Sequence, residues 1–424
     1  MGKFNPVEKY FAELLSKFPK AKNGIKKLYT VINYYFHRKE YRFKSDFKIK
    51  PVISDDKHES FFGYYDKSPV NSTRRYIVFH ETGGIISNKA PDPKKPVNIM
   101  LFDSKNNNYR KIAETSAYNW QQGSKLQWLN ENKFIFNDFD GSNYISKIYN
   151  LESLSFNILN LPVYDCYKDE FALSLNFTRL NSLDTHYGYK NISCADFDDL
   201  KNDGIFLIDL KTGESKLIVS LEKVIALHTR EGQKSAKHCF NHIMIDPDGN
   251  NFIFIHRWYQ AGRRFDSLIL SNIEGTELKV LADQDFVSHC CWYDHQTVIG
   301  YFRHDSYGNS YYRISIKTGQ TDLLSHKLKT FGDGHPSFFG NKMLFDSYPD
   351  RSRMQHLYIF DIDKNEIKEI GCFLSPLKFF GETRCDLHPR RATGENKIFF
   401  DSTHEGKRRL YQIVMAPILN TAFF

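Results

Sequence analysis

The fold is decided by residues 237–258, whose sequence is KHCFNHIMIDPDGNNFIFIHRW. An apolar run lies on each side of the segment Asp246-Pro247-Asp248-Gly249, and such residues favour a tight reversal of the chain. The stretch therefore predicts a β-hairpin. It carries His242 before the turn and His256-Arg257 after it, so one hairpin offers both a proton carrier and a positive charge.

The same succession of strand, turn and apolar second strand recurs along the chain. Its other copies lie at His58–His80, Gln121–Asp138, weakly at Leu173–Thr178, Ser288–Trp292, Gly334–Ser347 and Leu387–Ser402. About seven units with a period of roughly 50 residues match the blades of a propeller, each of four strands. We therefore predict an all-β fold, a seven-bladed β-propeller over residues 51–424, with a short helical extension over residues 1–50.

Composition is consistent with a folded protein rich in β-sheet. Of the 424 residues, 41% are apolar and 15% are aromatic, and aromatic residues favour strands. The seven cysteines form an odd set without a Cys-x-x-Cys pair, which argues against a disulfide framework and a thiolate zinc site. No apolar core of a signal peptide and no run of about 18 apolar residues is found, so we expect a soluble, cytoplasmic protein.

Charge is concentrated at the amino terminus. Residues 1–50 contain 13 Lys/Arg and 4 Asp/Glu, a net charge of +9, so the other residues carry −1 of the total of +8. Apolar residues at helical spacing predict two short amphipathic helices, one over residues 7–18 and one over residues 25–36, separated by Pro19 and Gly24. Such a basic segment either packs on the propeller or makes a peripheral contact with a membrane or a protein. Nucleic acid is a poorer fit.

Histidines carry the functional signal. The chain has 16 of them, and five stand at matching places in the units: His58, His238 or His242, His289, His335 and His388. The first strands of all blades line the central channel of a propeller, so these side chains converge at one mouth. Converging imidazoles suit a metal or acid–base site. Alternatively, each histidine bonds to the neighbouring blade.

Three short motifs resemble the oligogalacturonate lyases, a family of seven-bladed propellers. They are Asn241-His242 before Pro-Asp-Gly, the stretch Ser288-His289-x-x-Trp292, and the late His-Pro turn followed by Phe-Asp-Ser. The resemblance implies metal-assisted β-elimination of a uronate-containing glycan. It implies His242 as the base, and His289 and His388 as ligands of a divalent ion such as Mn²⁺. His335 is a further candidate ligand. For the assisting arginine, the resemblance leaves Arg230, Arg257 and Arg384 open.

The chain also departs from the family pattern. The late-blade ligand region of the family is richer in His and Gln than Arg384-Cys385-Asp386-Leu387-His388, and Asp386 is the candidate replacement for a neutral ligand. The chemistry itself requires a base of near-neutral pKa and a cation at the uronate carboxylate, which absorbs the charge of the carbanion. The candidate substrate-binding residues are His58, Tyr65, Gln121, Trp258 and Trp292.

Two other functions stay open. A non-catalytic glycan-binding or scaffold propeller in cell-surface polysaccharide biosynthesis would use the same mouth without chemistry. A glycosyltransferase is suggested by Asp138-Phe139-Asp140 and Asp196-Phe197-Asp198, which resemble an Asp-x-Asp metal motif. No nucleotide-binding α/β pattern accompanies these motifs, and Gly-rich phosphate loops and a serine-hydrolase elbow are absent from the sequence.

Overall fold

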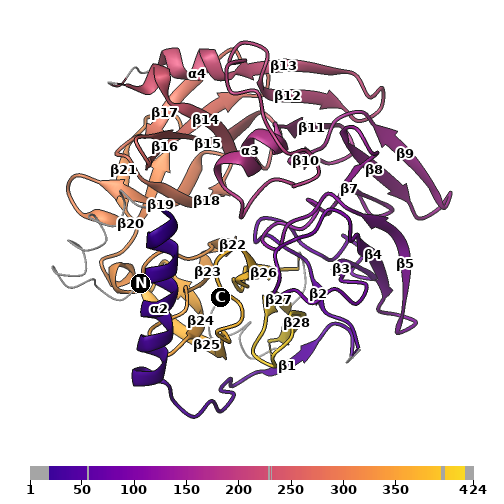
Figure 1. Cartoon of the computed structure of the whole chain (residues 1–424), viewed down its shortest axis with the longest axis vertical. Helices are drawn as coiled ribbons and strands as arrows, with labels where there is room; N and C mark the ends of the chain where they lie inside the picture. Colours follow the sequence, from indigo (N-terminus) through magenta and orange to yellow (C-terminus); the bar gives the residue numbers. More distant parts are fainter. Residues whose placement is uncertain (1–18, 55–56, 228–229, 231, 393–396, 416–424) are drawn as a thin grey trace.

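The computed structural model describes residues 19–54, 57–227, 230, 232–392 and 397–415. These form seven antiparallel sheets of four strands each, arranged around a central axis (Figure 1). The predicted all-β, seven-bladed propeller is therefore confirmed. Within the described residues, no helix is both long and apolar enough to cross a membrane.

The blades follow one another along the chain. Blade 1 contains β2 (Ser60–Phe61), β3 (Tyr76–Glu81), β4 (Val97–Asp103) and β5 (Asn108–Thr115). Blade 2 contains β6 (Gln127–Trp128), β7 (Lys133–Phe139), β8 (Tyr144–Asn150) and β9 (Ser155–Leu159). Blade 3 contains β10 (Asp165–Tyr167), β11 (Phe171–Ser174), β12 (Gly204–Asp209) and β13 (Ser215–Ser220). Blade 4 contains β14 (Lys237–Ile245), β15 (Asn251–Gln260), β16 (Arg263–Asn272) and β17 (Leu278–Ala282).

The remaining blades complete the ring. Blade 5 contains β18 (Val287–Asp294), β19 (Thr297–His304), β20 (Gly308–Ser315) and β21 (Thr321–Leu323). Blade 6 contains β22 (Ser337–Phe339), β23 (Lys342–Asp346), β24 (Met354–Asp361) and β25 (Glu366–Leu374). Blade 7 contains β26 (Arg390–Arg391), β27 (Lys397–Ser402), β28 (Arg409–Val414) and, as its outer strand, β1 (Lys48–Pro51). The ring is thus closed by pairing the first described strand with the last, from Lys48 opposite Val414 to Pro51 opposite Tyr411.

Helices are few in the described chain. They are α2 (Pro19–His37), α3 (Phe177–Leu183) and α4 (Leu221–Leu227), with the short 3₁₀ turns η1 (Gln233–Ser235), η2 (Lys327–Thr330) and η3 (Gly381–Thr383). The predicted helix over residues 25–36 lies within α2, which runs through Gly24 without a break. The predicted helix over residues 7–18 lies outside the described residues. The predicted division at residue 50 falls inside β1.

The weak third unit differs from its prediction. The inner strand of blade 3 is β10, and Leu173 belongs to the second strand, β11. Between β11 and β12 the chain makes a long insertion that contains α3. Because this insertion separates the second strand of the blade from the third, the unit shows only part of the pattern seen in the others.

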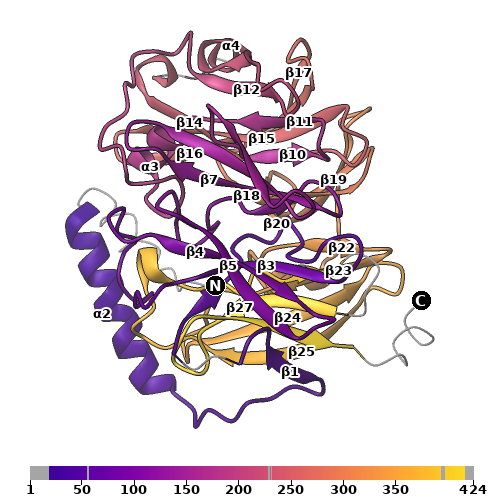
Figure 2. The same ribbon diagram turned by 90° about the vertical axis from the view of Figure 1, so that its right-hand side faces the viewer.

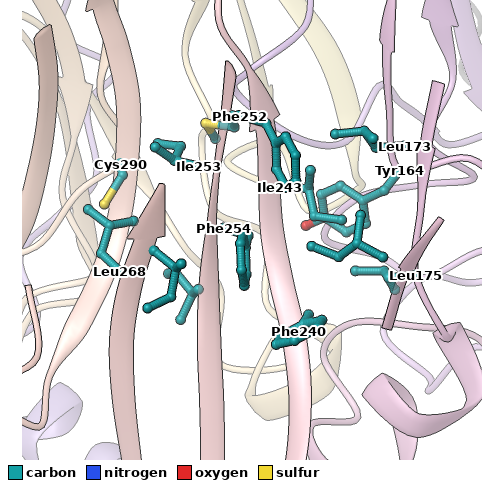
Figure 3. Close-up of a cluster of buried hydrophobic side chains, with 14 of the residues drawn as sticks. Tyr164, Leu173, Leu175, Phe240, Ile243, Phe252, Ile253, Phe254, Leu268 and Cys290 are labelled. Atoms are coloured by element: carbon teal, nitrogen blue, oxygen red, sulfur yellow. The ribbon is translucent and has the colours of Figure 1, made fainter. Parts of the chain in front are cut away.

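Apolar side chains fill the spaces between neighbouring blades. The hairpin of β14 and β15 presents Phe252, Ile253 and Phe254, all fully buried, to the blades on either side. Figure 3 shows these three side chains between residues of blade 3, such as Leu173, and residues of blade 5, such as Cys290. The β-branched and aromatic residues of the hairpin therefore form strands because each face packs on a neighbouring blade.

A polar side chain joins successive blades at four junctions. It is the fifth residue of the second strand in each case: His80, Asn137, Asp346 or Asp401. Asp401 in blade 7 accepts hydrogen bonds from the backbone N–H groups of Phe62 and Gly63 in blade 1, both at 3.0 Å. It also pairs with the buried Arg390 at 2.9 Å. Since all of these groups are buried, the carboxylate satisfies donors that water cannot reach.

We expect Asp401→Ala to destabilise the fold by about 3–5 kcal/mol, because it leaves the Arg390 charge buried without its partner. The measurement is the free energy of unfolding from urea titration. Asp305→Ala, at an exposed turn, is the control and should stay within about 0.5 kcal/mol of the wild type. A loss for Asp401→Ala no larger than that of the control would contradict the proposed role of the junction.

His80 makes the stability of the fold depend on pH. Its ring is fully buried beside the Ser124 hydroxyl at 2.8 Å, and burial lowers its pKa to about 3. An unfolded histidine titrates near pH 6.5, so below that pH the unfolded chain binds a proton that the folded chain does not. The contribution of His80 to stability is therefore complete above about pH 6.5 and is lost as the pH falls towards about 3.

Between about pH 7.5 and about pH 5.5, this group should lower the free energy of unfolding by about 1.4 kcal/mol. His80→Gln should remove that part of the pH dependence in urea titrations, whereas His295→Ala, at an exposed turn, should not. If the free energy of unfolding of His80→Gln still falls as much between these two pH values as that of the wild type, His80 is not the group responsible.

Candidate functional site

Four of the predicted histidines meet at the axis of the propeller. His242 lies in β14, His289 lies in β18, and His335 and His388 come just before β22 and β26. Their exposed fractions are only 4%, 2%, 1% and 2%. The ring of Tyr64 lies among them, with centroid distances of 5.4, 6.4, 6.1 and 5.0 Å to these four rings in the same order. Residues from four blades thus form one buried group, which we call the histidine cluster.

Irregular backbone places these side chains. The register of β14 and β15 shifts between Asn241 and Met244, and His242 has a φ of 55°. In β18 the register shifts between Val287 and Cys290, which brackets His289. His388 also has a positive φ, 45°. Bulges re-aim side chains and are frequent beside active sites, and strained backbone of this kind concentrates at functional positions.

Besides Nδ1 of His242, three buried polar atoms in and beside the cluster have no hydrogen-bond partner: His335 Nε2, His388 Nε2 and Asp386 Oδ1. The other ring nitrogens are held, His335 Nδ1 by Asp346 at 2.8 Å and His388 Nδ1 by the carbonyl oxygen of Gly63 at 2.8 Å. These three residues offer ligand atoms that all lie within 4.8 Å of one another. In a metal-binding histidine, one ring nitrogen binds the metal and the other is usually held by a hydrogen bond. The Nε2 atoms of His335 and His388 are free and their Nδ1 atoms are held, so the donor set fits a divalent ion.

His289 lies next to this group. Its ring centroid is 4.0 Å from that of His335, and its Nδ1 lies 3.0 Å from the Asp333 carboxylate. Burial, and then the charge of His335, lower the pKa of His289. Burial also acts to lower the pKa of His335, but the Asp346 carboxylate outweighs it and raises that pKa. The described residues contain one other possible metal group, His356, Glu369 and Cys372 on β24 and β25.

His242 has the surroundings of a neutral base. Burial, followed by the nearby charge of Arg257, keeps its pKa well below the usual range. Its Nε2 contacts the Tyr64 hydroxyl, and its Nδ1 has no partner. The ring of Tyr187 lies 5.2 Å away. His242 is therefore uncharged at neutral pH, with one ring nitrogen uncommitted.

The three candidate arginines have different surroundings. Arg384 donates to Asp386 at 2.7 Å and lies over the ring of Tyr348, which is itself 5.9 Å from His335. Arg257 is buried and held by Asp266 at 2.7 Å and by Asp184 at 3.2 Å. Arg230 instead pairs with Asp283 and Asp285 before β18. The described contacts thus bring Arg384 and Arg257 to the cluster.

The candidate substrate-binding residues are more scattered. Tyr65 is packed against His335 at 5.4 Å and donates to the Cys290 carbonyl, and Gln121 donates to the Arg384 carbonyl at 2.9 Å. Trp258 stacks on Phe265, and the Trp292 indole donates to the Met244 carbonyl. His58 is 40% exposed and lies 3.8 Å from Glu81. Tyr65 therefore packs against the cluster and Gln121 bonds to the backbone of Arg384, while the tryptophans pack within and between blades.

The two Asp-x-Asp motifs form no metal group. Asp138 pairs with Lys147, and Asp140 accepts backbone N–H bonds from Ser142 and Asn143 in its own turn. Asp196 accepts the backbone N–H of Asp198 in the same way. These carboxylates serve local structure.

Several residues at the site were not among the candidates drawn from the sequence. They are Tyr187, Asp333, Asp346 and Tyr348. Asp346 left a signal, since it is the Asp of the repeated Phe-Asp-Ser motif. Tyr187 left none, because it lies in the insertion between β11 and β12.

The fold is similar to that of oligogalacturonate lyases. One, solved in complex with manganese, matches with a TM-score of 0.65 and 15% identity over 90% of this chain and 98% of that one. The lyase from Vibrio parahaemolyticus matches with a TM-score of 0.59 and 12% identity, over 88% and 97%. The chain matches no protein-family model and no curated protein sequence. At these identities the likeness defines the fold: a lyase-like seven-bladed propeller.

Proposed function

We propose that this protein is a lyase that cleaves uronate-containing glycans by metal-assisted β-elimination. The proposal rests on two features that lie together at the axis. One is His242, which is uncharged and has a free Nδ1. The other is the group of His335, His388 and Asp386, whose free atoms could bind a metal ion. One of the similar structures holds manganese, and oligogalacturonate lyases act, by their name, on an acidic oligosaccharide.

His335, His388 and Asp386 would hold the divalent ion, with His289 beside them. When bound, the ion would supply positive charge at the uronate carboxylate. Arg384 lies at the same edge of the cluster and is 23% exposed. It would contact the carboxylate or a neighbouring sugar, since guanidinium groups pair well with carboxylates. Asp346 fixes His335 and also accepts the backbone N–H of His388 at 3.1 Å, so one carboxylate would orient both ligands.

His242 would take the C5 proton. With its Nε2 hydrogen directed at the Tyr64 hydroxyl oxygen, Nδ1 presents a lone pair. The electron pair of the C5–H bond then forms the C4–C5 double bond, the C4–O bond breaks, and the departing oxygen takes a proton from water. Burial keeps His242 uncharged, so the base is available at neutral pH.

The test is the near-ultraviolet absorbance of the conjugated double bond, with uronate oligosaccharides as substrate and Mn²⁺ present. His242→Ala should lower the rate by about 10²–10⁴-fold, the range expected for a positioned general base. His295→Ala, at an exposed turn between β18 and β19, is the matched control and should retain activity. If the wild type binds these glycans but yields no chromophore with any divalent metal, the protein is a binding propeller.

A further inference from the structure

Helix α2 exposes a continuous apolar stripe. The stripe consists of six side chains whose spacing of three or four residues puts them on one side of the helix: Ile25, Leu28, Tyr29, Ile32, Tyr35 and Phe36. Their exposed fractions run from 39% for Tyr29 to 83% for Phe36. Tyr29 is the most covered of the six, and the other five are 44–83% exposed. Contiguous apolar surface of this kind marks an interaction site.

The surroundings of the stripe are strongly basic. Residues 24–50 contain eight Lys/Arg and two Asp/Glu, a net charge of +6. Arg38 and Lys39, just after the helix, are exposed. The first acidic residue after α2, Glu40, is paired with Arg42 at 3.1 Å. An apolar stripe with basic flanks is complementary to an anionic lipid surface.

The helix lies on the face of the propeller where the loop between β23 and β24 approaches the histidine cluster. The loop between β23 and β24 contains both Tyr348, whose ring is 5.9 Å from His335, and Arg353, which interacts electrostatically with Tyr34 of α2. Figure 1 shows α2 across the face turned to the viewer, and Figure 2 shows it running along that face in profile. After the helix, the chain is attached to β25, where the Ser45 hydroxyl donates to the Ile370 carbonyl at 2.8 Å.

We propose that α2 docks on an anionic membrane surface, with the apolar stripe at the boundary of the acyl chains and the histidine cluster facing the bilayer. The stripe points away from the propeller, because the partly buried residues of the helix, Thr30, Val31, Asn33 and Tyr34, are not part of it. Docking would therefore place the mouth of the propeller close to the lipid headgroups. This inference does not depend on the lyase activity.

The experiment is co-sedimentation of the full chain with phosphatidylcholine vesicles, with and without phosphatidylserine. We expect binding only when phosphatidylserine is present, and weaker binding when salt shortens the screening length from about 10 Å at 0.1 M to about 3 Å at 1 M. The double variant Leu28→Glu, Ile32→Glu should bind at least about tenfold more weakly, because it puts two charges at the acyl boundary. Ile158→Glu is the matched control, since Ile158 is 56% exposed on the outer strand β9, and it should bind like the wild type.

Two results would overturn the proposal. The first is a wild type that binds neither kind of vesicle. The second is a wild-type dimer that the double variant converts to a monomer, with unchanged vesicle binding, because the stripe would then serve a second copy of the chain. Light scattering after size-exclusion chromatography measures the oligomeric state of both proteins.

Discussion

The structure depends on buried polar side chains, each the fifth residue of the second strand of a blade, that bond to the segment next to the inner strand of the following blade. Asp346 is the clearest case, because its carboxylate accepts the His335 ring and backbone at 2.8 Å and the His388 backbone at 3.1 Å. Asp401 does the same for blade 1. A hydrogen bond of this kind fixes the angle between two blades and the positions of the residues at the axis. The ring and the site are therefore stabilised by the same contacts.

The repeat could be predicted from the sequence because each blade is built locally. The hairpin at residues 237–258 combines strand-forming residues with a turn at Gly249, whose φ is 77°, so its signal is complete within 22 residues. Blade 3 was harder, since the long insertion between β11 and β12 separates strands that follow one another closely in the other blades. A local pattern is informative only where the strands of a unit are close together in the sequence.

The site was predicted in part for a similar reason. His242, His289, His335 and His388 occupy equivalent places in four units, so the symmetry of the fold brings them together. Tyr187 could not be found in this way, because it lies in the insertion between β11 and β12. The sequence also could not show which of the candidate arginines, such as Arg384 or Arg230, lies at the site. That choice depends on the partners of each, which are Asp386 for the first and Asp285 for the second.

The proposed chemistry at the axis requires one divalent ion on the free ring nitrogens of the cluster. Anomalous diffraction from crystals soaked in manganese, recorded on both sides of the manganese absorption edge, can locate such an ion. We expect a single strong peak bonded to Nε2 of His335 and Nε2 of His388. A peak at His356, Glu369 and Cys372 with none at the axis, or no peak at all, would contradict it.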